Sequence, residues 1–230
     1  VVFEEVDPSP KCTGYHGNEN VRTAIRDSCN LFFFHVGYRF ATLNGGYDDA
    51  GGLEFMKKYA DLYGLSQKSG VEISEYDPDI SDLDSVRSYI GQGTNAYTTT
   101  QLARYCSTIA NKGTTYDLTL LDHIVDSYGR TVWSAEPVIY NYVEMEEYQW
   151  DAIRNGMHDA VEAKKYFADL PVTVCGKTGT AQQSRSKPDH ALYIAFAPAY
   201  GEPEVALCAR IPFGFYSDYA AQLGHECLQE

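Results

Sequence analysis

The chain has no apolar run of the roughly 18 residues that a membrane-spanning helix requires. Basic residues are also few, with 18 Lys and Arg against 32 Asp and Glu and a formal net charge of -14. A nucleic-acid partner is therefore not expected, because no basic surface is available to displace the counterions of a phosphate backbone. Acidity of this size favours a soluble domain.

Cysteine occurs in no recognised metal or redox spacing. The six cysteines lie far apart, and no pair shows the C-x-x-C spacing. Most stand among apolar neighbours, which favours buried free thiols, although an even number also permits disulfides in an extracellular domain. No histidine joins a cluster of ligands along the sequence, and His16 is interpreted as a turn residue. We therefore expect no metal and no cofactor.

The hydrophobic fraction of 44% is sufficient for a sizeable core, and the chain contains no internal repeat. Apolar periodicity, N-cap residues and glycine stops predict helices over residues 21–27, 30–41, 53–63, 98–111, 148–163 and 218–228. Residues 66–97 are turn-rich and irregular. Strands are predicted over residues 172–176, 190–198 and 205–212, with a hairpin over 124–133. We expect an α+β domain in which helices cover both faces of an antiparallel sheet.

The most informative stretch is the sequence VCGKTGTA at residues 174–181, which follows a β-prone run. Lys177 supplies a cation, and Thr178 and Thr180 supply hydroxyls. Gly179 allows a ligand to approach the backbone closely. These residue types could bind a carboxylate and offer a backbone N–H to a developing oxyanion. The alternative interpretation is a solvated strand end.

A second candidate site is the triplet of Ser28, Cys29 and Asn30, predicted at a helix start. A serine and an amide two positions apart can face one cleft, where the serine relays a proton and the amide binds a peptide carbonyl. Alone this signal is weak, because Ser and Asn are also ordinary N-cap residues.

Together, the two motifs resemble those of the penicillin-binding proteins, class B type, in their D,D-transpeptidase domain. The S-x-N and K-T-G motifs occur in the family's order, roughly 150 residues apart. Residues 15–30, 90–113 and 189–198 are also similar to characteristic family stretches. The resemblance covers nearly the whole chain, so residues 1–230 are interpreted as one partial transpeptidase domain.

The resemblance implies an acyl-enzyme reaction on D-Ala-D-Ala stem peptides in peptidoglycan cross-linking, with β-lactams as inhibitors and no cofactor. Ser28 would pass a proton towards the leaving amine, and Asn30 would hold the substrate amide. Lys177 would supply positive potential, Thr178 and Thr180 would bind the substrate carboxylate, and the Thr180 N–H would be an oxyanion donor. Other cell-wall synthesis proteins are the expected partners, at the outer face of the bacterial cytoplasmic membrane.

One feature departs from the family pattern. The family's nucleophile lies in an S-x-x-K motif upstream of S-x-N, whereas this chain has S-x-x-K only at residues 184–187. The chain is therefore expected to begin after the nucleophile and membrane anchor, to be inactive alone, and to expose a sheet edge through which it could dimerise. The alternatives are a D,D-carboxypeptidase or β-lactamase of the same fold, and a binding or sensor domain without a nucleophile.

Overall fold

The computed structural model describes residues 2–184 and 186–229. Its central sheet has three antiparallel strands in the order β5-β6-β7, with β5 at Cys175–Ala181, β6 at His190–Ala197 and β7 at Val205–Ile211. The strand predicted over residues 172–176 was misplaced, because β5 contains the whole K-T-G motif. Pairing with β6, from Cys175 opposite Phe196 to Ala181 opposite His190, overrides the low strand propensity of Gly176 and Gly179.

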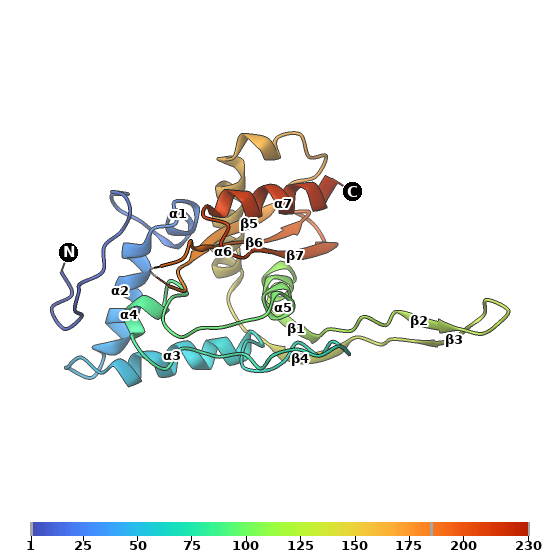
Figure 1. Ribbon diagram of the computed structural model, residues 1–230, viewed down its shortest axis with the longest axis horizontal. Helices are drawn as coiled ribbons and strands as arrows, with labels where there is room; N and C mark the ends of the chain where they lie inside the picture. The colour runs from blue at the N-terminus through green and yellow to red at the C-terminus, as the bar shows by residue number, and fades with distance from the viewer. Residues whose placement is uncertain (1, 185, 230) are drawn as a thin grey trace.

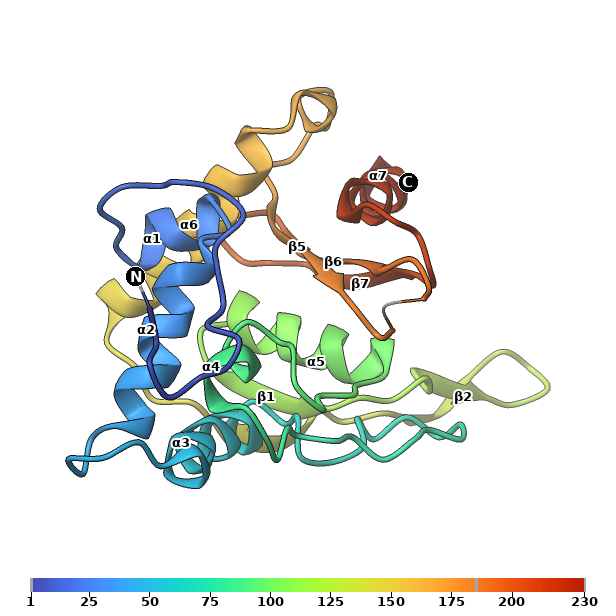
Figure 2. The same cartoon turned by 60° about the vertical axis from the view of Figure 1, so that its left-hand side comes forward.

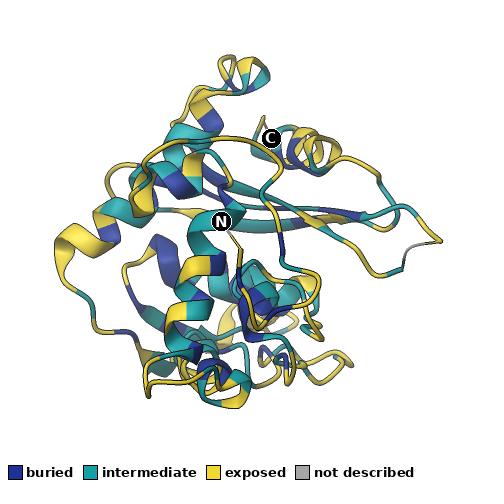
Figure 3. Cartoon of the chain, turned by 90° about the vertical axis from the view of Figure 1, so that its left-hand side faces the viewer, coloured by how far each residue is buried: buried dark blue, intermediate teal, exposed yellow. Residues whose placement is uncertain are grey.

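Helices cover both faces of this sheet, as predicted (Figure 1). Side chains of β6 alternate between two cores. Ala191, Tyr193 and Ala195 belong to the core under helix α7 (Ser217–Gln229). Phe196 belongs to the core on the other face, with residues of α5 (Thr99–Ala110) and α6 (Glu147–Glu162). Both faces of β6 are thus apolar, and buried residues lie along the sheet (Figure 3).

The remaining helices form a layer beside the sheet (Figure 2). They are α1 (Val21–Arg26), α2 (Asn30–Ala41), α3 (Asp49–Leu62) and the short α4 (Ser85–Ser88). Helix α3 begins earlier than predicted and includes Gly52. A glycine fits here because a Cβ would lie only 2.9 Å from Ser85 Cβ and 3.0 Å from Ala41 Cβ. Helix α4 was not predicted. Its N-cap residue is Asp84, whose carboxylate accepts a hydrogen bond from Arg87 N at 2.9 Å.

A long arm extends from this body (Figure 1). Strands β2 (His123–Val125) and β3 (Thr131–Ser134) form the predicted hairpin, and all their residues are exposed. Strands β1 (Thr114–Asp117) and β4 (Val138–Tyr142) pair at its base, which was not predicted. The segment between α6 and β5 contains a 3-10 turn, Lys165–Phe167. In the described part of the chain, no helix is long and apolar enough to cross a membrane.

Candidate active site

The fold brings the two motifs into direct contact. Lys177 Nζ donates hydrogen bonds to Ser28 Oγ at 2.6 Å and to the Thr178 carbonyl at 2.8 Å. Ser28 is exposed, whereas Lys177 and Asn30 are half-buried, so the contact lies at an accessible surface. Residues 149 positions apart in the sequence therefore share one site.

Ser28 is held in an unusual backbone conformation between α1 and α2. Its φ is 52°, in the left-handed region that disfavours residues with a Cβ. Two backbone hydrogen bonds maintain the turn, from Ser28 N to Ile25 O at 3.3 Å and from Cys29 N to Ala24 O at 2.9 Å. Asn30 follows as the first residue of α2. The turn thus presents the Ser28 hydroxyl to Lys177 beside the start of a helix.

The outer edge of β5 presents backbone groups to the same site. The Thr178 carbonyl accepts from Lys177, and the Thr180 carbonyl accepts from Gln92 Nε2 at 3.4 Å, so both point away from β6. The N–H and C=O of one residue in an antiparallel strand point to the same side. The Thr180 N–H therefore also faces outward, away from β6.

Gln92 is a third contributor that the sequence analysis did not assign to the site. It lies between Gly91 and Gly93, with φ values of 82° and 81°. The sequence carries this signal as G-Q-G, because two left-handed glycines allow a tight loop to project a side chain. The loop bridges the helical layer and the end of β5 through the Thr180 carbonyl.

Burial changes the acidity of Lys177. Removal from water, followed by the charge of Lys164, lowers the pKa of Lys177 to about 8. At neutral pH the ammonium form of Lys177 still predominates, and the positive charge of Lys164 repels it. A bound carboxylate would offset both effects, because an opposite charge stabilises the ammonium form.

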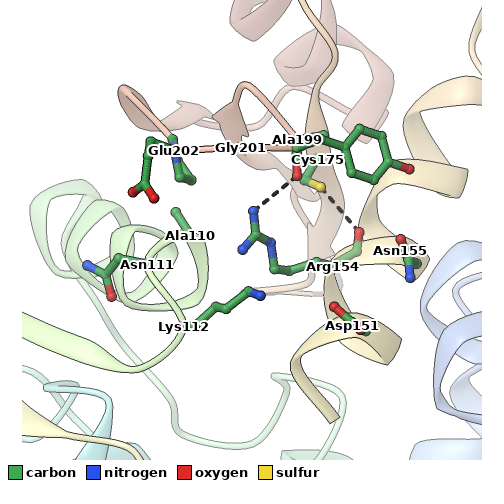
Figure 4. Close-up of a pocket in the computed structure, with 12 residues that line it drawn as sticks. Ala110, Asn111, Lys112, Asp151, Arg154, Asn155, Cys175, Ala199, Gly201 and Glu202 are labelled. Atoms are coloured by element: carbon green, nitrogen blue, oxygen red, sulfur yellow. Dashed lines mark hydrogen bonds between the residues drawn. The ribbon is translucent and has the colours of Figure 1, made fainter. Parts of the chain in front are cut away.

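A separate cavity of about 310 Å³ lies beside α6 and the start of β5 (Figure 4). Its central group, Arg154, donates to the Ala199 carbonyl at 3.0 Å and lies over the Phe196 ring at 5.3 Å. Burial raises the pKa of the Cys175 thiol to about 12, and this thiol donates to the Arg154 carbonyl at 3.2 Å. These groups already have partners and stabilise the packing of α6 against β5.

His16, interpreted from the sequence as a turn residue, and His190, at the start of β6, have different surroundings. His190 Nδ1 accepts from Phe213 N at 3.0 Å, and its Nε2 lies 2.9 Å from Gln183 Oε1, so it orders the loops beside the end of β5. His16 lies outside any helix or strand, but the expectation that no histidine joins a cluster of ligands was wrong. The His16 ring lies with Cys12 and Cys29, with the three ligand atoms within 4.8 Å of one another. Sequence spacing could not reveal this cluster, because folding of the α1–α2 turn brings Cys29 back to the N-terminal segment.

None of the six cysteines, all within the described residues, forms a disulfide. The expectation of buried free thiols holds for Cys29, Cys106 and Cys175, whereas Cys12 and Cys208 are half-buried and Cys227 is exposed.

The geometry of the two motifs agrees with the comparison to known families. The sequence model of the penicillin-binding protein transpeptidase domain matches residues 6–222. The chain belongs to this family.

Among curated relatives, penicillin-binding protein 2A of Bacillus subtilis strain 168 is 27% identical over 232 residues, covering 88% of this chain and 32% of that protein. Peptidoglycan D,D-transpeptidase MrdA of Haemophilus influenzae is 25% identical over 234 residues, covering 86% of this chain and 33% of that protein. The chain therefore spans about a third of the length of these relatives.

The fold is shared with solved members of the family. Penicillin-binding protein A from Mycobacterium tuberculosis, as its imipenem acyl-enzyme complex, superposes with a TM-score of 0.76 at 25% identity, over 92% of this chain and 47% of that chain. The predicted α+β transpeptidase fold is confirmed.

Proposed function

We propose that this chain forms the substrate-carboxylate side of a peptidoglycan D,D-transpeptidase active site. The observation that carries the proposal is the 2.6 Å contact between Lys177 Nζ and Ser28 Oγ, beside the outward-facing backbone of Thr180. A stem peptide ending in D-Ala-D-Ala has a terminal carboxylate and a scissile carbonyl next to it. Lys177, Thr178 and Thr180 would bind the first, and the Thr180 N–H would polarise the second.

The outer edge of β5 suggests how the peptide backbone binds. Outward N–H and C=O groups at Thr178 and Thr180 can pair with an extended peptide, which then adds a strand to the sheet. The Asn30 amide, at the first residue of α2, would hold the peptide from the opposite wall. β-Lactams, which carry a carboxylate beside a reactive carbonyl, would bind the same groups.

The contact with Lys177 supports a proton-transfer role for the Ser28 hydroxyl. The Lys177 ammonium donates to Ser28 Oγ, so the hydroxyl hydrogen of Ser28 is directed elsewhere. Ser28 can therefore pass this proton to the leaving amine while its Oγ takes a proton from the Lys177 ammonium, so that no alkoxide is left and Lys177 becomes neutral. The nucleophile itself is not assigned in this chain, because the S-x-x-K sequence at residues 184–187 follows the K-T-G motif instead of preceding Ser28, and Arg185 lies outside the described residues.

The test uses the full-length protein that contains this chain. Acylation by a fluorescent penicillin and cross-linking of stem peptides are measured for Lys177→Ala and Ser28→Ala, with Lys165→Ala as the matched surface control. Loss of a positioned proton-transfer group is expected to slow acylation by about 10²–10⁴-fold. Unchanged acylation in both site variants would refute the assignment. Release of free D-Ala without cross-linking would instead favour the carboxypeptidase alternative.

We propose in addition that residues 1–230 alone form no covalent penicillin adduct, since no serine–lysine pair with the family's placement is present. Intact-mass analysis after incubation with benzylpenicillin tests this. A mass increase of one β-lactam, mapped to any serine of the chain, would contradict it and would also weaken the sensor alternative, which requires a cleft without a nucleophile.

Two further proposals concern location and assembly. The full-length protein would act at the outer face of the cytoplasmic membrane with other cell-wall synthesis proteins. Without substrate, the open edge of β5 would pair with a second copy of the chain, because unpaired backbone groups are a template for strand addition. Light scattering tests this pairing, and a monomeric mass at high protein concentration would contradict it.

A further inference from the structure

The cavity beside α6 is separate from every group that the proposed reaction uses. It lies where α6, the end of α5, the start of β5 and the turn between β6 and β7 meet (Figure 4). Its volume of about 310 Å³ is at the lower end of the range of ligand pockets, so it suits a small molecule. Two cations, two carboxylates and two amides are among the residues that line it: Lys112, Arg154, Asp151, Glu202, Asn111 and Asn155.

Arg154 carries a buried positive charge that no carboxylate of the described residues neutralises. Only 8% of its surface is exposed, and within residues 2–184 and 186–229 its guanidinium forms no ion pair within 4.0 Å. The neighbours of the guanidinium are the neutral Ala199 carbonyl and the Phe196 ring. The ring offsets part of the cost of burying the charge. A guanidinium has five N–H donors, so an anion in the cavity could bind to those that the carbonyl leaves open.

Asp151 lies one turn before Arg154 on α6 but does not pair with it. Residues three positions apart are neighbours on one face of a helix, and Asp84 and Arg87 at this spacing form an ion pair of 2.5 Å. In the part of the chain that the structure describes, Asp151 forms no ion pair. Arg154 is instead turned inward, while Asp151 is exposed. Opposite charges thus line one cavity without neutralising each other (Figure 4).

The balance of charges favours a ligand that carries both signs. Glu202 adds a second exposed carboxylate from the turn between β6 and β7, whereas the Lys112 ammonium pairs with Glu147. Arg154 is therefore the cation open to a ligand among the described residues that line the cavity. Asp151 and Glu202 would repel a simple anion, and Arg154 would repel a simple cation. An α-amino acid has an ammonium and a carboxylate on one carbon, which matches opposite charges one helical turn apart.

We propose that this cavity binds a small zwitterion, namely a free α-amino acid with a short side chain such as alanine. The ligand carboxylate would accept hydrogen bonds from the Arg154 guanidinium, which suits a planar carboxylate. The ligand ammonium would donate to Asp151, with Glu202 beside it. Since Cys175 at the start of β5 also lines the cavity, the bound amino acid would lie behind the strand that carries the K-T-G motif.

The experiment measures ligand binding rather than catalysis, so it is independent of the proposed function. D-Alanine and L-alanine are each titrated into the full-length protein by isothermal titration calorimetry, and binding of either supports the proposal. Alaninamide lacks the carboxylate and propionate lacks the ammonium. We expect each of these analogues to bind about 10–100-fold more weakly than alanine, because each loses one charge-assisted set of hydrogen bonds.

Three variants locate the bound amino acid. Asp151→Asn, at an exposed position, should weaken alanine binding about 10–100-fold, and Glu162→Gln, at an exposed carboxylate of α6 outside the cavity, is the matched control. Arg154→Met should abolish binding. Because Arg154 also packs against β6 and could be needed for folding, Asp151→Asn alone is sufficient for the test. Lys177→Ala should bind alanine as the natural protein does, which separates this cavity from the candidate active site.

Several results would overturn the proposal. They are the absence of alanine binding, equal affinity for alanine and either analogue, and unchanged affinity in Asp151→Asn. Loss of alanine binding in Lys177→Ala would also overturn it, because the amino acid would then lie at the K-T-G motif. That last result would support the proposed function while excluding the cavity, so the two proposals can fail separately.

Discussion

The lowered pKa of Lys177 predicts that carboxylate binding weakens at an unusually low pH. A lysine exposed to water keeps its charge until above pH 10. Here burial and Lys164 lower the pKa to about 8, so the positive charge is lost as the pH rises through that value. Between pH 7 and pH 9 the protonated fraction falls from about 90% to about 10%, and the affinity for a peptide carboxylate should fall up to about tenfold.

The assay is equilibrium binding of a peptide ending in D-Ala-D-Ala to the full-length protein from pH 6 to pH 10. The same peptide with a C-terminal amide is the ligand control and should show little dependence on Lys177. In Lys177→Arg the charge persists across this range, because guanidinium groups do not lose their proton. Its carboxylate binding should therefore stay flat above pH 8. An equal decline in the natural protein and in Lys177→Arg would refute the assignment of the titrating group.

Thermodynamic linkage gives an independent check on the direction of the Lys177 pKa shift. A lysine with a lowered pKa in the folded state binds fewer protons than the unfolded chain between about pH 8 and pH 10. Its contribution to stability must therefore rise with pH in this window, opposite to the fall in carboxylate binding. Comparison of urea unfolding of the natural protein and of Lys177→Met over this range isolates the contribution. A difference in stability that does not change with pH would show that Lys177 titrates as an exposed lysine.

Two predictions concern the packing behind β5. A Cβ at Gly176 would lie 2.0 Å from the Tyr193 hydroxyl oxygen, so Gly176→Ala should destabilise the fold by about 1–3 kcal/mol. Gly179→Ala is the matched control in thermal unfolding, since its Cβ would contact only Leu192 Cβ at 3.5 Å, and equal losses in both variants would contradict the argument. Tyr193→Phe removes a buried hydroxyl that has no partner among the described residues, and should be neutral or stabilise by about 1 kcal/mol. A lower free energy of unfolding for Tyr193→Phe in chemical denaturation would mean that the hydroxyl has a hydrogen-bond partner.

Much of the helical layer could be predicted because local signals decide it. The capping box of Thr98 and Gln101 marks the start of α5, and Gly64, with a φ of 74°, follows the end of α3. The pairing of β1 with β4 could not be predicted in the same way. Its strands are short and separated by the β2–β3 hairpin, so only tertiary contacts bring them together.

The residues of the candidate site also differ in whether a local signal reveals them. Lys177, Ser28 and Asn30 could be proposed from their motifs, because each combines residue types that the chemistry requires. Gln92 could not, since its role depends on which strand its loop meets. The cluster around His16 was missed for the same reason, because three donors on two segments have no characteristic spacing in the sequence.

At Ser28, the left-handed backbone favours glycine, whereas the proposed chemistry requires a hydroxyl. This conformation costs a residue with a Cβ roughly 1–2 kcal/mol and costs glycine almost nothing. Any search for more stable variants that ignores activity should thus favour glycine at position 28, and every such variant would lose the hydroxyl that contacts Lys177. Persistence of serine at this position would then record selection for chemistry alone, in a place where folding by itself would choose otherwise.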